Sequence, residues 1–149
     1  MKIERPIIAL DFPDRLSVQQ FLTKFPADEQ LFLKVGMELF YSEGQDIVRE
    51  LIAGGHDVFL DLKCHDIPHT VEQAMKVIGQ LGVKLTTIHA SGGSQMMQAA
   101  KAGLLAGSNG DQTAGILAIT QLTSTNQTML EEEQLVHQPL KTVFCITRN

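Results

Sequence analysis

Three charged residues in the segment 61–66 have the types and spacing needed to deliver a proton to carbon. Asp61, Lys63 and Asp66 form an Asp-x-Lys-x-x-Asp pattern. In a strand, residues two positions apart share a face, so Asp61 and Lys63 are predicted to project the same way. We expect the Lys63 ammonium to lie between the two carboxylates, because a buried charge is costly unless it is paired. Such neighbours keep a lysine protonated, and a protonated lysine held in a cavity can stabilise and then protonate a developing carbanion.

The same carboxylates would repel a carboxylate on a bound substrate, and that repulsion would end when carbon dioxide leaves. A surface salt-bridge cluster, which contributes only about 0–1 kcal/mol to stability, is the alternative interpretation of the pattern. The apolar residues on both sides, Val58-Phe59-Leu60 before it and Ile67-Pro68 after it, favour a buried strand. The sequence therefore predicts a buried site for acid–base chemistry at the end of this strand.

Five strand-like segments alternate with helix-like segments and must position this site. The expected strands are 7–11, 31–35, 58–63, 85–89 and 115–122, and the expected helices cover about 17–25, 47–52, 70–80 and 94–105, with Ser17 and Ser94 as N-caps. Parallel strands need crossover connections, so this alternation predicts an α/β fold with a parallel sheet. We expect a single domain over residues 1–149, since most domains contain roughly 100–200 residues.

Two architectures fit this order of elements: an open doubly wound sheet, and an incomplete (β/α)8 TIM barrel made of about its first five βα units. No Gly-x-Gly-x-x-Gly turn follows the first strand, which weighs against a dinucleotide-binding sheet. Polar residues stand at or near the carboxyl end of every expected strand: Asp11, Lys34, Asp61 with Lys63, His89 and Thr123. In a barrel these ends converge on one mouth, where barrel enzymes place their chemistry. The sequence therefore favours the incomplete barrel.

Composition and charge argue against several classes of protein. The net charge of −5 is unlike the basic face of a nucleic-acid-binding domain. No apolar run approaches the roughly 20 residues that a membrane helix needs, and the first six residues contain no apolar signal core. Cys64 and Cys145 form neither a disulfide framework nor a metal-ligand pattern. We therefore expect a soluble cytoplasmic protein that binds neither nucleic acid nor a membrane.

Three side chains near the site invite other interpretations. Cys64 beside a histidine suggests a reactive thiol, but a free cysteine is more often a small buried apolar residue. His65 and His89 suggest a metal, but no third ligand stands at a credible spacing. We expect both to be hydrogen-bonded structural histidines, with no metal at the site.

The run from Phe59 to Val71, Phe-Leu-Asp-Leu-Lys-Cys-His-Asp-Ile-Pro-His-Thr-Val, resembles the signature of orotidine 5'-phosphate decarboxylases. The resemblance extends to about Leu140, through the segments 7–11, 33–36, 89–93 and 120–124. It implies a TIM-barrel enzyme of de novo pyrimidine biosynthesis that acts on orotidine 5'-phosphate, works as a homodimer, and needs no metal or organic cofactor.

The resemblance also implies roles for the residues that match the signature. Lys63 would protonate the C6 carbanion of the pyrimidine to give uridine 5'-phosphate, and Asp61 would lie beside the substrate carboxylate. Asp66 would reach across a dimer interface into the neighbouring subunit's site, with Ile67 and Thr70 near it.

Three further residues would bind the rest of the substrate. Asp11 and Lys34 would contact the ribose hydroxyls, Lys34 would help to hold the charge network, and Thr123 would hydrogen-bond the pyrimidine. Two positions depart from the family: Cys64 stands where leucine is common, and His69 where asparagine is common. We expect Cys64 to change packing only, and His69 to have a modest effect on the dimer contact or substrate fit.

A complete barrel has eight βα units and about 250 residues, and its phosphate site commonly comes from the loops after strands 7 and 8. The sequence supplies five expected strands, so strands 1 and 5 are expected to be unpaired edges. We expect the isolated chain to fold poorly and to have negligible activity. Residues 143–149 have little family character, and a single-base slip in the reading frame is our hypothesis for them.

Two other functions compete with this interpretation. The related 3-keto-L-gulonate 6-phosphate decarboxylases share the Asp-x-Lys-x-x-Asp pattern and use a magnesium ion. The segment 120–124 and the pair Ile67-Pro68 favour the orotidine enzymes instead. A non-catalytic half-barrel that binds a partner subunit through the surface around Asp66 is the alternative outside the enzymes.

Overall fold

The computed structural model describes residues 5–145, with side chains up to residue 143. Five strands, β1 (Ile7–Ala9), β2 (Phe32–Val35), β3 (Asp57–Cys64), β4 (Leu85–His89) and β5 (Gly115–Ile119), form one sheet. Between them lie α1 (Arg15–Leu22), α2 (Met37–Glu43), α3 (Gln45–Ala53), α4 (Pro68–Gln80), the short 3-10 helix η1 (Ala90–Gly92) and α5 (Gly93–Gly107). The one-turn helix η2 (Met129–Glu133) and α6 (Leu140–Cys145) follow β5.

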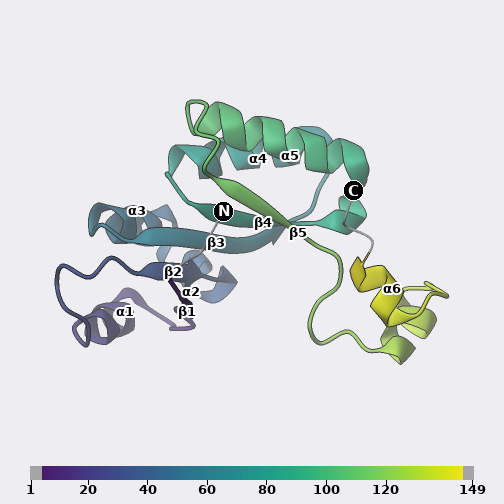
Figure 1. Cartoon of the computed structure of the whole chain (residues 1–149), viewed down its shortest axis with the longest axis horizontal. Helices are drawn as coiled ribbons and strands as arrows, with labels where there is room; N and C mark the ends of the chain where they lie inside the picture. Colours follow the sequence, from purple (N-terminus) through teal and green to yellow (C-terminus); the bar gives the residue numbers. More distant parts are fainter. Residues whose placement is uncertain (1–4, 146–149) are drawn as a thin grey trace.

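The strands lie side by side in the order of the sequence, β1-β2-β3-β4-β5, and every neighbouring pair is parallel. A doubly wound sheet reverses its strand order at a switch point, whereas a barrel wall does not. The observed order is that of the first five βα units of a TIM barrel, as the sequence predicted. Figure 1 shows α4 and α5 lying together along one face of the sheet.

The two faces of the sheet are packed differently. Residues at alternate positions, such as Leu33 and Val35 of β2 and Val58 and Leu60 of β3, are fully buried in one large cluster with the helices. The residues between them point to the opposite face, where a separate small cluster of Phe32, Phe59 and Leu85 forms. We call this second face the inner face of the sheet. Alternation with a period of two places the residues of each strand on the two faces in turn.

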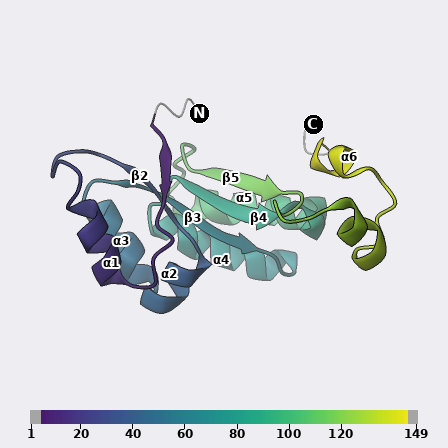
Figure 2. The same cartoon turned by 90° about the horizontal axis from the view of Figure 1, so that it is seen from below.

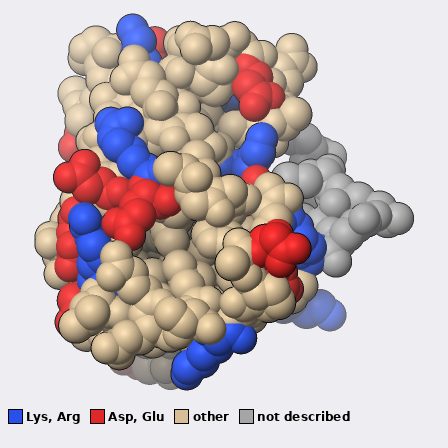
Figure 3. All heavy atoms as spheres, turned by 90° about the vertical axis from the view of Figure 1, so that its left-hand side faces the viewer, with Lys and Arg blue, Asp and Glu red and all other residues tan. Residues whose placement is uncertain are grey.

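The amino ends of the strands are joined by ion pairs. Arg5 pairs with Asp57 at the start of β3 and donates a 2.7 Å hydrogen bond to the Gln30 carbonyl. Lys84, just before β4, has its Nζ 3.9 Å from Oδ2 of Asp111. Figure 3 shows the corresponding side of the molecule, where basic and acidic side chains are neighbours. These contacts are partly exposed and fix the ends of the strands, away from the mouth that the carboxyl ends form.

The structure corrects four details of the expected elements. The second crossover contains two helices, because Gly44, at φ 69°, separates α2 from α3. Asp14 rather than Ser17 caps α1, and its carboxylate accepts a 2.8 Å hydrogen bond from the Ser17 amide. No side chain caps α5, which begins at Gly93 rather than after Ser94. β5 ends at Ile119 rather than at residue 122, because its partner β4 ends at His89, opposite Ile119.

β1 and β5 lie at the two ends of the strand order, so each has one neighbouring strand among residues 5–145. The prediction of two edge strands is therefore confirmed for the described part of the chain. Beyond β5 the chain leaves the sheet, and α6 lies apart from it in both Figure 1 and Figure 2. The hypothesis about residues 143–149 concerns a segment that lies mostly outside the described residues. Within the described chain, no helix combines the length and apolar character that a bilayer crossing requires.

The contact between α4 and α5 gives a first testable expectation. A Cβ added at Gly103 would lie 2.1 Å from the Glu72 carbonyl oxygen, which is backbone and cannot rotate away. Alanine normally stabilises a helix by about 1 kcal/mol relative to glycine, but here the helices must separate, and overpacking costs about 1–3 kcal/mol. We expect Gly103→Ala to lower the free energy of unfolding by about 2 kcal/mol, measured by urea denaturation.

Ala102, the exposed neighbour on α5, provides a control for helix propensity. Ala102→Gly is expected to cost about 1 kcal/mol or less, the ordinary propensity difference. A Gly103→Ala chain as stable as the unsubstituted one would show that the two helices are not packed backbone to backbone at this point.

Candidate active site

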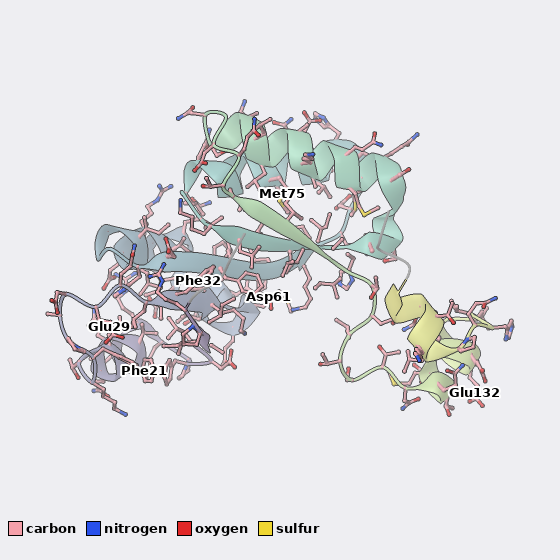
Figure 4. All side chains as sticks on the ribbon, in the orientation of Figure 1. Phe21, Glu29, Phe32, Asp61, Met75 and Glu132 are labelled. Atoms are coloured by element: carbon pink, nitrogen blue, oxygen red, sulfur yellow. The ribbon has the colours of Figure 1, made fainter. Side chains whose placement is uncertain are left out.

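The carboxyl ends of β2 and β3 bring charged side chains to the inner face. Asp61 follows Phe59 by two positions in β3, so the two side chains share that face. Figure 4 shows Asp61 on the same side of the sheet as Phe32, whereas Met75 of α4 lies on the other side. Strand periodicity therefore places an acid next to a buried apolar cluster.

Lys63 and Asp61 form a close ion pair at this position. The Lys63 Nζ lies 2.9 Å from both the Oδ1 and the Oδ2 of Asp61. The side chain of Lys63 is 26% exposed and that of Asp61 is 15% exposed. Ion pairs on the open surface contribute little because water screens them, but this pair is mostly shielded. The structure thus brings together the two residues that the sequence predicted to share a face.

A break in the ladder between β3 and β4 shapes this part of the site. Leu60 is paired with Thr86 and Cys64 with Ile88, so Asp61, Leu62 and Lys63 lie opposite Thr87 alone. Extra residues in one strand form a bulge, which re-aims side chains and commonly occurs next to active sites. Lys63 has φ 50°, a backbone conformation uncommon for residues other than glycine.

Thr87 contacts both members of the pair and was not among the residues identified from the sequence. Its hydroxyl accepts a 2.9 Å hydrogen bond from the Lys63 amide and donates a 2.8 Å bond to Asp61 Oδ1. The only signal in the sequence is its place two residues before His89, on the same face of a predicted strand. That position alone does not reveal a contact with the neighbouring strand.

Asp11 and Lys34 form a second ion pair nearby in the sheet. The Lys34 Nζ lies 3.2 Å from Asp11 Oδ1, and the adjacent Leu10 amide donates a 2.9 Å hydrogen bond to the Lys34 carbonyl. Asp11 is 71% exposed at its side chain, whereas Lys34 is 24% exposed. Among residues 5–143, no ion pair within 4.0 Å links this pair to Asp61 or Lys63. Asp11–Lys34 and Asp61–Lys63 are therefore two separate ion pairs at this end of the sheet.

Asp66 does not pair with Lys63, contrary to the expectation that the ammonium lies between two carboxylates. β3 ends at Cys64, and the exposed turn that follows directs Asp66 outward, where its Oδ1 accepts a hydrogen bond of 2.6 Å from the Ile67 amide. Ile67 is 66% exposed, and His69 and Thr70 at the start of α4 are also exposed. Among the residues whose side chains are described, Lys63 has one carboxylate partner, Asp61. Asp66, Ile67 and Thr70 form a separate exposed surface.

Thr123 lies in the exposed loop after β5. Figure 1 shows this loop leaving the end of the sheet. Among the described residues, no hydrogen bond joins Thr123 to Asp61 or Lys63. The structure therefore places Thr123 beyond the end of β5, which β4 separates from β3, and shows no contact with the ion pair.

The rings of His65 and His89 lie beside each other, tilted by 42°, at the end of the site. Their centroids are 5.4 Å apart. Among the described residues, neither ring makes a hydrogen bond to another side chain or backbone group, so the expected hydrogen bonds of these histidines find no support there. Burial lowers the pKa of His89, and the positive charges of His65 and Lys63 lower it further. Across the described part of the chain, no group of three or more His, Cys, Asp or Glu side chains is placed to hold a metal ion.

Cys64 lies at the end of β3, half-buried beside the large core cluster. Desolvation raises the pKa of its thiol. A thiol is nucleophilic only as the thiolate, so burial keeps this group protonated and unreactive. This agrees with the interpretation of Cys64 as a packing residue.

The lowered pKa of His89 predicts how stability changes with pH. The folded chain favours neutral His89, whereas the unfolded chain takes up the proton first as the pH falls below the ordinary histidine value of about 6.5. His89 therefore makes a contribution to stability that is present above about pH 6.5 and is lost as the pH falls through the folded pKa. We expect His89→Gln to reduce the loss of unfolding free energy between about pH 7.5 and about pH 5.5, measured by urea denaturation at both values.

His137, which is exposed, provides the matched control. His137→Gln should leave the difference between the two pH values unchanged. If His89→Gln made the chain lose more stability on acidification than the unsubstituted chain does, the direction assigned to the pKa of His89 would be wrong.

Comparisons with known proteins show which family the chain resembles. A family model described as "Orotidine 5'-phosphate decarboxylase / HUMPS family" matches residues 4–144. The chain is 68% identical over 141 residues to an orotidine 5'-phosphate decarboxylase of Ligilactobacillus salivarius, covering 95% of this chain and 60% of the relative. It is 57% identical over 140 residues to the enzyme of that name in Enterococcus faecalis, covering 93% of this chain and 59% of the relative.

Two solved structures are similar to this chain over most of its length. An orotidine 5'-phosphate decarboxylase of Lactobacillus acidophilus matches with a TM-score of 0.87 at 42% identity, covering 95% of this chain and 64% of the other. A conserved protein of Geobacillus kaustophilus matches with a TM-score of 0.89 at 51% identity, covering 93% of this chain and 64% of the other. The chain thus spans about 60% of the length of the curated relatives that it matches.

Proposed function

The chain belongs to the orotidine 5'-phosphate decarboxylase / HUMPS family, and from this premise we propose that it supplies the decarboxylating part of an orotidine 5'-phosphate decarboxylase. That enzyme would release carbon dioxide from orotidine 5'-phosphate and form uridine 5'-phosphate for pyrimidine biosynthesis. The observation that carries the proposal is the Lys63–Asp61 pair, with 2.9 Å between Nζ and each carboxylate oxygen. Residues 1–149 would form part of a TIM-barrel decarboxylase domain.

In the proposed reaction, the bond between C6 and the carboxylate carbon breaks and its electron pair stays on C6. The Lys63 ammonium stabilises this carbanion by its charge and then transfers a proton from Nζ to C6. Solvent afterwards returns a proton to the lysine. Asp61 keeps Lys63 protonated and lies beside the substrate carboxylate, whose charge it repels until carbon dioxide leaves.

The other residues would bind the substrate around this centre. Asp11 and Lys34 would hydrogen-bond the ribose hydroxyls, which suits a polar pair at the end of the neighbouring strands. Thr123 would hydrogen-bond the pyrimidine from the loop after β5. The chemistry needs no cofactor, because the ammonium supplies both the charge and the proton.

Asp66, Ile67 and Thr70 would act in a second subunit. Their exposure at the start of α4 suits a contact with a partner, in which Asp66 would enter the partner's site. The complete enzyme would then be a cytoplasmic homodimer. Its substrate is a small anion, and the net charge of −5 gives no reason to assign a nucleic-acid partner.

A hybrid enzyme tests the proposed function. In it, residues 4–144 of this chain replace the matching segment of the Ligilactobacillus salivarius relative. We expect the hybrid to convert orotidine 5'-phosphate to uridine 5'-phosphate without added metal, followed by ultraviolet absorbance. A folded hybrid that instead decarboxylated 3-keto-L-gulonate 6-phosphate in the presence of magnesium would replace this proposal with the sugar-phosphate alternative. A folded hybrid inactive on both substrates would favour the non-catalytic half-barrel.

A further inference from the structure

The bulge in β3 leaves the backbone of the proposed proton donor without its ordinary partner. Asp61, Leu62 and Lys63 share one opposing residue, Thr87. An unpaired amide in a buried strand is costly, so a group from elsewhere must accept its hydrogen bond. The Thr87 hydroxyl does so at 2.9 Å, which satisfies the Lys63 amide in the uncommon conformation with φ 50°.

The same hydroxyl also fixes the acid. A hydroxyl has one donor and two acceptor sites, and Thr87 uses the donor on Asp61 Oδ1 at 2.8 Å. Thr87 is 1% exposed, so water does not compete for these bonds. One side chain on β4 thereby holds the backbone amide of Lys63 and the carboxylate of Asp61 on β3.

We propose that Thr87 is a positioning residue: its hydroxyl holds the β3 bulge so that the Lys63 ammonium and the Asp61 carboxylate meet in the orientation needed to protonate carbon. The effect of Thr87 on the reaction rate rests on the proposed function, whereas the effect of Thr87 on the bulge does not. The role requires a residue whose side chain donates and accepts at once. Valine has the same shape but can do neither, and serine can do both.

The adjacent residue offers a matched control. Thr86 is also fully buried in β4, and its hydroxyl donates a 2.9 Å hydrogen bond to the Leu60 carbonyl. Successive strand residues point to opposite faces, so Thr86 faces the helices rather than the ion pair. Thr86→Val removes a buried hydroxyl from the same strand without touching Lys63 or Asp61.

Amide hydrogen exchange in the full chain, followed by NMR, tests the effect on the bulge. Thr87→Val should speed exchange of the Lys63 amide by about fivefold relative to the Lys84 amide, since a typical hydrogen bond contributes about 1 kcal/mol. Lys84 is a suitable reference because its amide bonds the Val58 carbonyl at 2.9 Å on the other side of the break. Thr87→Ser should restore slow exchange at Lys63, and Thr86→Val should leave the ratio of the two rates unchanged.

The hybrid enzyme tests the consequence for the rate. There, Thr87→Val should lower kcat by about 10- to 100-fold, because a small misplacement of reacting groups can cost that much. KM should change little, and Thr87→Ser should recover most of kcat. Thr86→Val should change kcat by less than about twofold, since it touches neither member of the pair.

Each result decides a separate question. Equal exchange ratios at Lys63 in the Thr87→Val and Thr86→Val chains would overturn the positioning role. Fast exchange at Lys63 in the Thr87→Ser chain would do the same, even if the valine variant did not fold. An unchanged kcat for Thr87→Val in an active hybrid would remove its consequence for the rate. Inactivity of the unsubstituted hybrid would count against the proposed function, and the exchange data would still decide what Thr87 does.

Discussion

Replacing Lys63 with alanine is expected to lower kcat of the hybrid enzyme by about 10⁴-fold or more. The substitution removes the proton donor, which contributes about 10²–10⁴ to the rate of such reactions. It also removes the positive charge that stabilises the carbanion, a further effect of about 10²–10³ for a well-placed group. The two effects come from one ammonium, so they need not multiply fully. The measurement is the rate of uridine 5'-phosphate formation at saturating orotidine 5'-phosphate.

Lys84 provides the control for the loss of a lysine. It lies at the start of β4, at the opposite end of the sheet, and its Nζ contacts Asp111 and Thr113. Lys84→Ala should leave kcat within about twofold, because exposed ion pairs contribute little even to stability. Comparable rates for the Lys63→Ala and Lys84→Ala enzymes, both folded, would mean that the Lys63 ammonium takes no part in the reaction.

Replacing Asp61 with asparagine is expected to lower kcat by about 10²–10³-fold. Asparagine keeps the shape of the side chain but removes the charge that pairs with Lys63 Nζ over 2.9 Å. The ammonium then loses both its orientation and the field that keeps it protonated, and electrostatic groups of this kind contribute about 10²–10³ to a rate. The substrate carboxylate also loses its repelling neighbour, so KM should fall or stay the same while kcat falls.

Asp57 lies in the same strand and provides a matched control. Its carboxylate pairs with Arg5 at the amino end of β3. Asp57→Asn removes a charge and an ion pair of the same type, so it should lower stability without an appreciable change in kcat. A hybrid in which Asp61→Asn raised KM and kept kcat would show that Asp61 serves substrate binding alone.

The layout of the sheet could be predicted from the sequence because strand patterning is local. Short apolar runs in the segments 31–35 and 58–60 mark β2 and β3 in the sequence. The structure then shows which alternate residues, such as Leu33 and Val58, face the helices. The ion pair could be predicted for the same reason, since Asp61 and Lys63 are two residues apart in one strand. The helix α2 could not, because it buries Leu39 alone and its apolar spacing is therefore weak.

Other features depend on geometry between elements and were missed or wrong. The contact of Thr87 with Lys63 depends on a break in register between β3 and β4, which no pattern within either strand reveals. Asp66 was expected to flank Lys63, but the turn after Cys64 carries it to the surface. The backbone contact at Gly103 depends on how closely α4 and α5 approach. In each case the residue was visible in the sequence and its partner was not.

The central claim is that the Lys63 ammonium exchanges a proton with C6 of the pyrimidine, and the reverse of that step tests it most directly. Because a reaction and its reverse use the same groups, an enzyme that protonates C6 must also remove that proton from the product. Uridine 5'-phosphate would be incubated with the hybrid enzyme in deuterated water, and the C6 proton signal followed by NMR. We expect the unsubstituted enzyme to replace this proton with deuterium and the Lys63→Ala enzyme not to do so. Equal exchange in both enzymes would contradict the assignment of Lys63 as the proton donor.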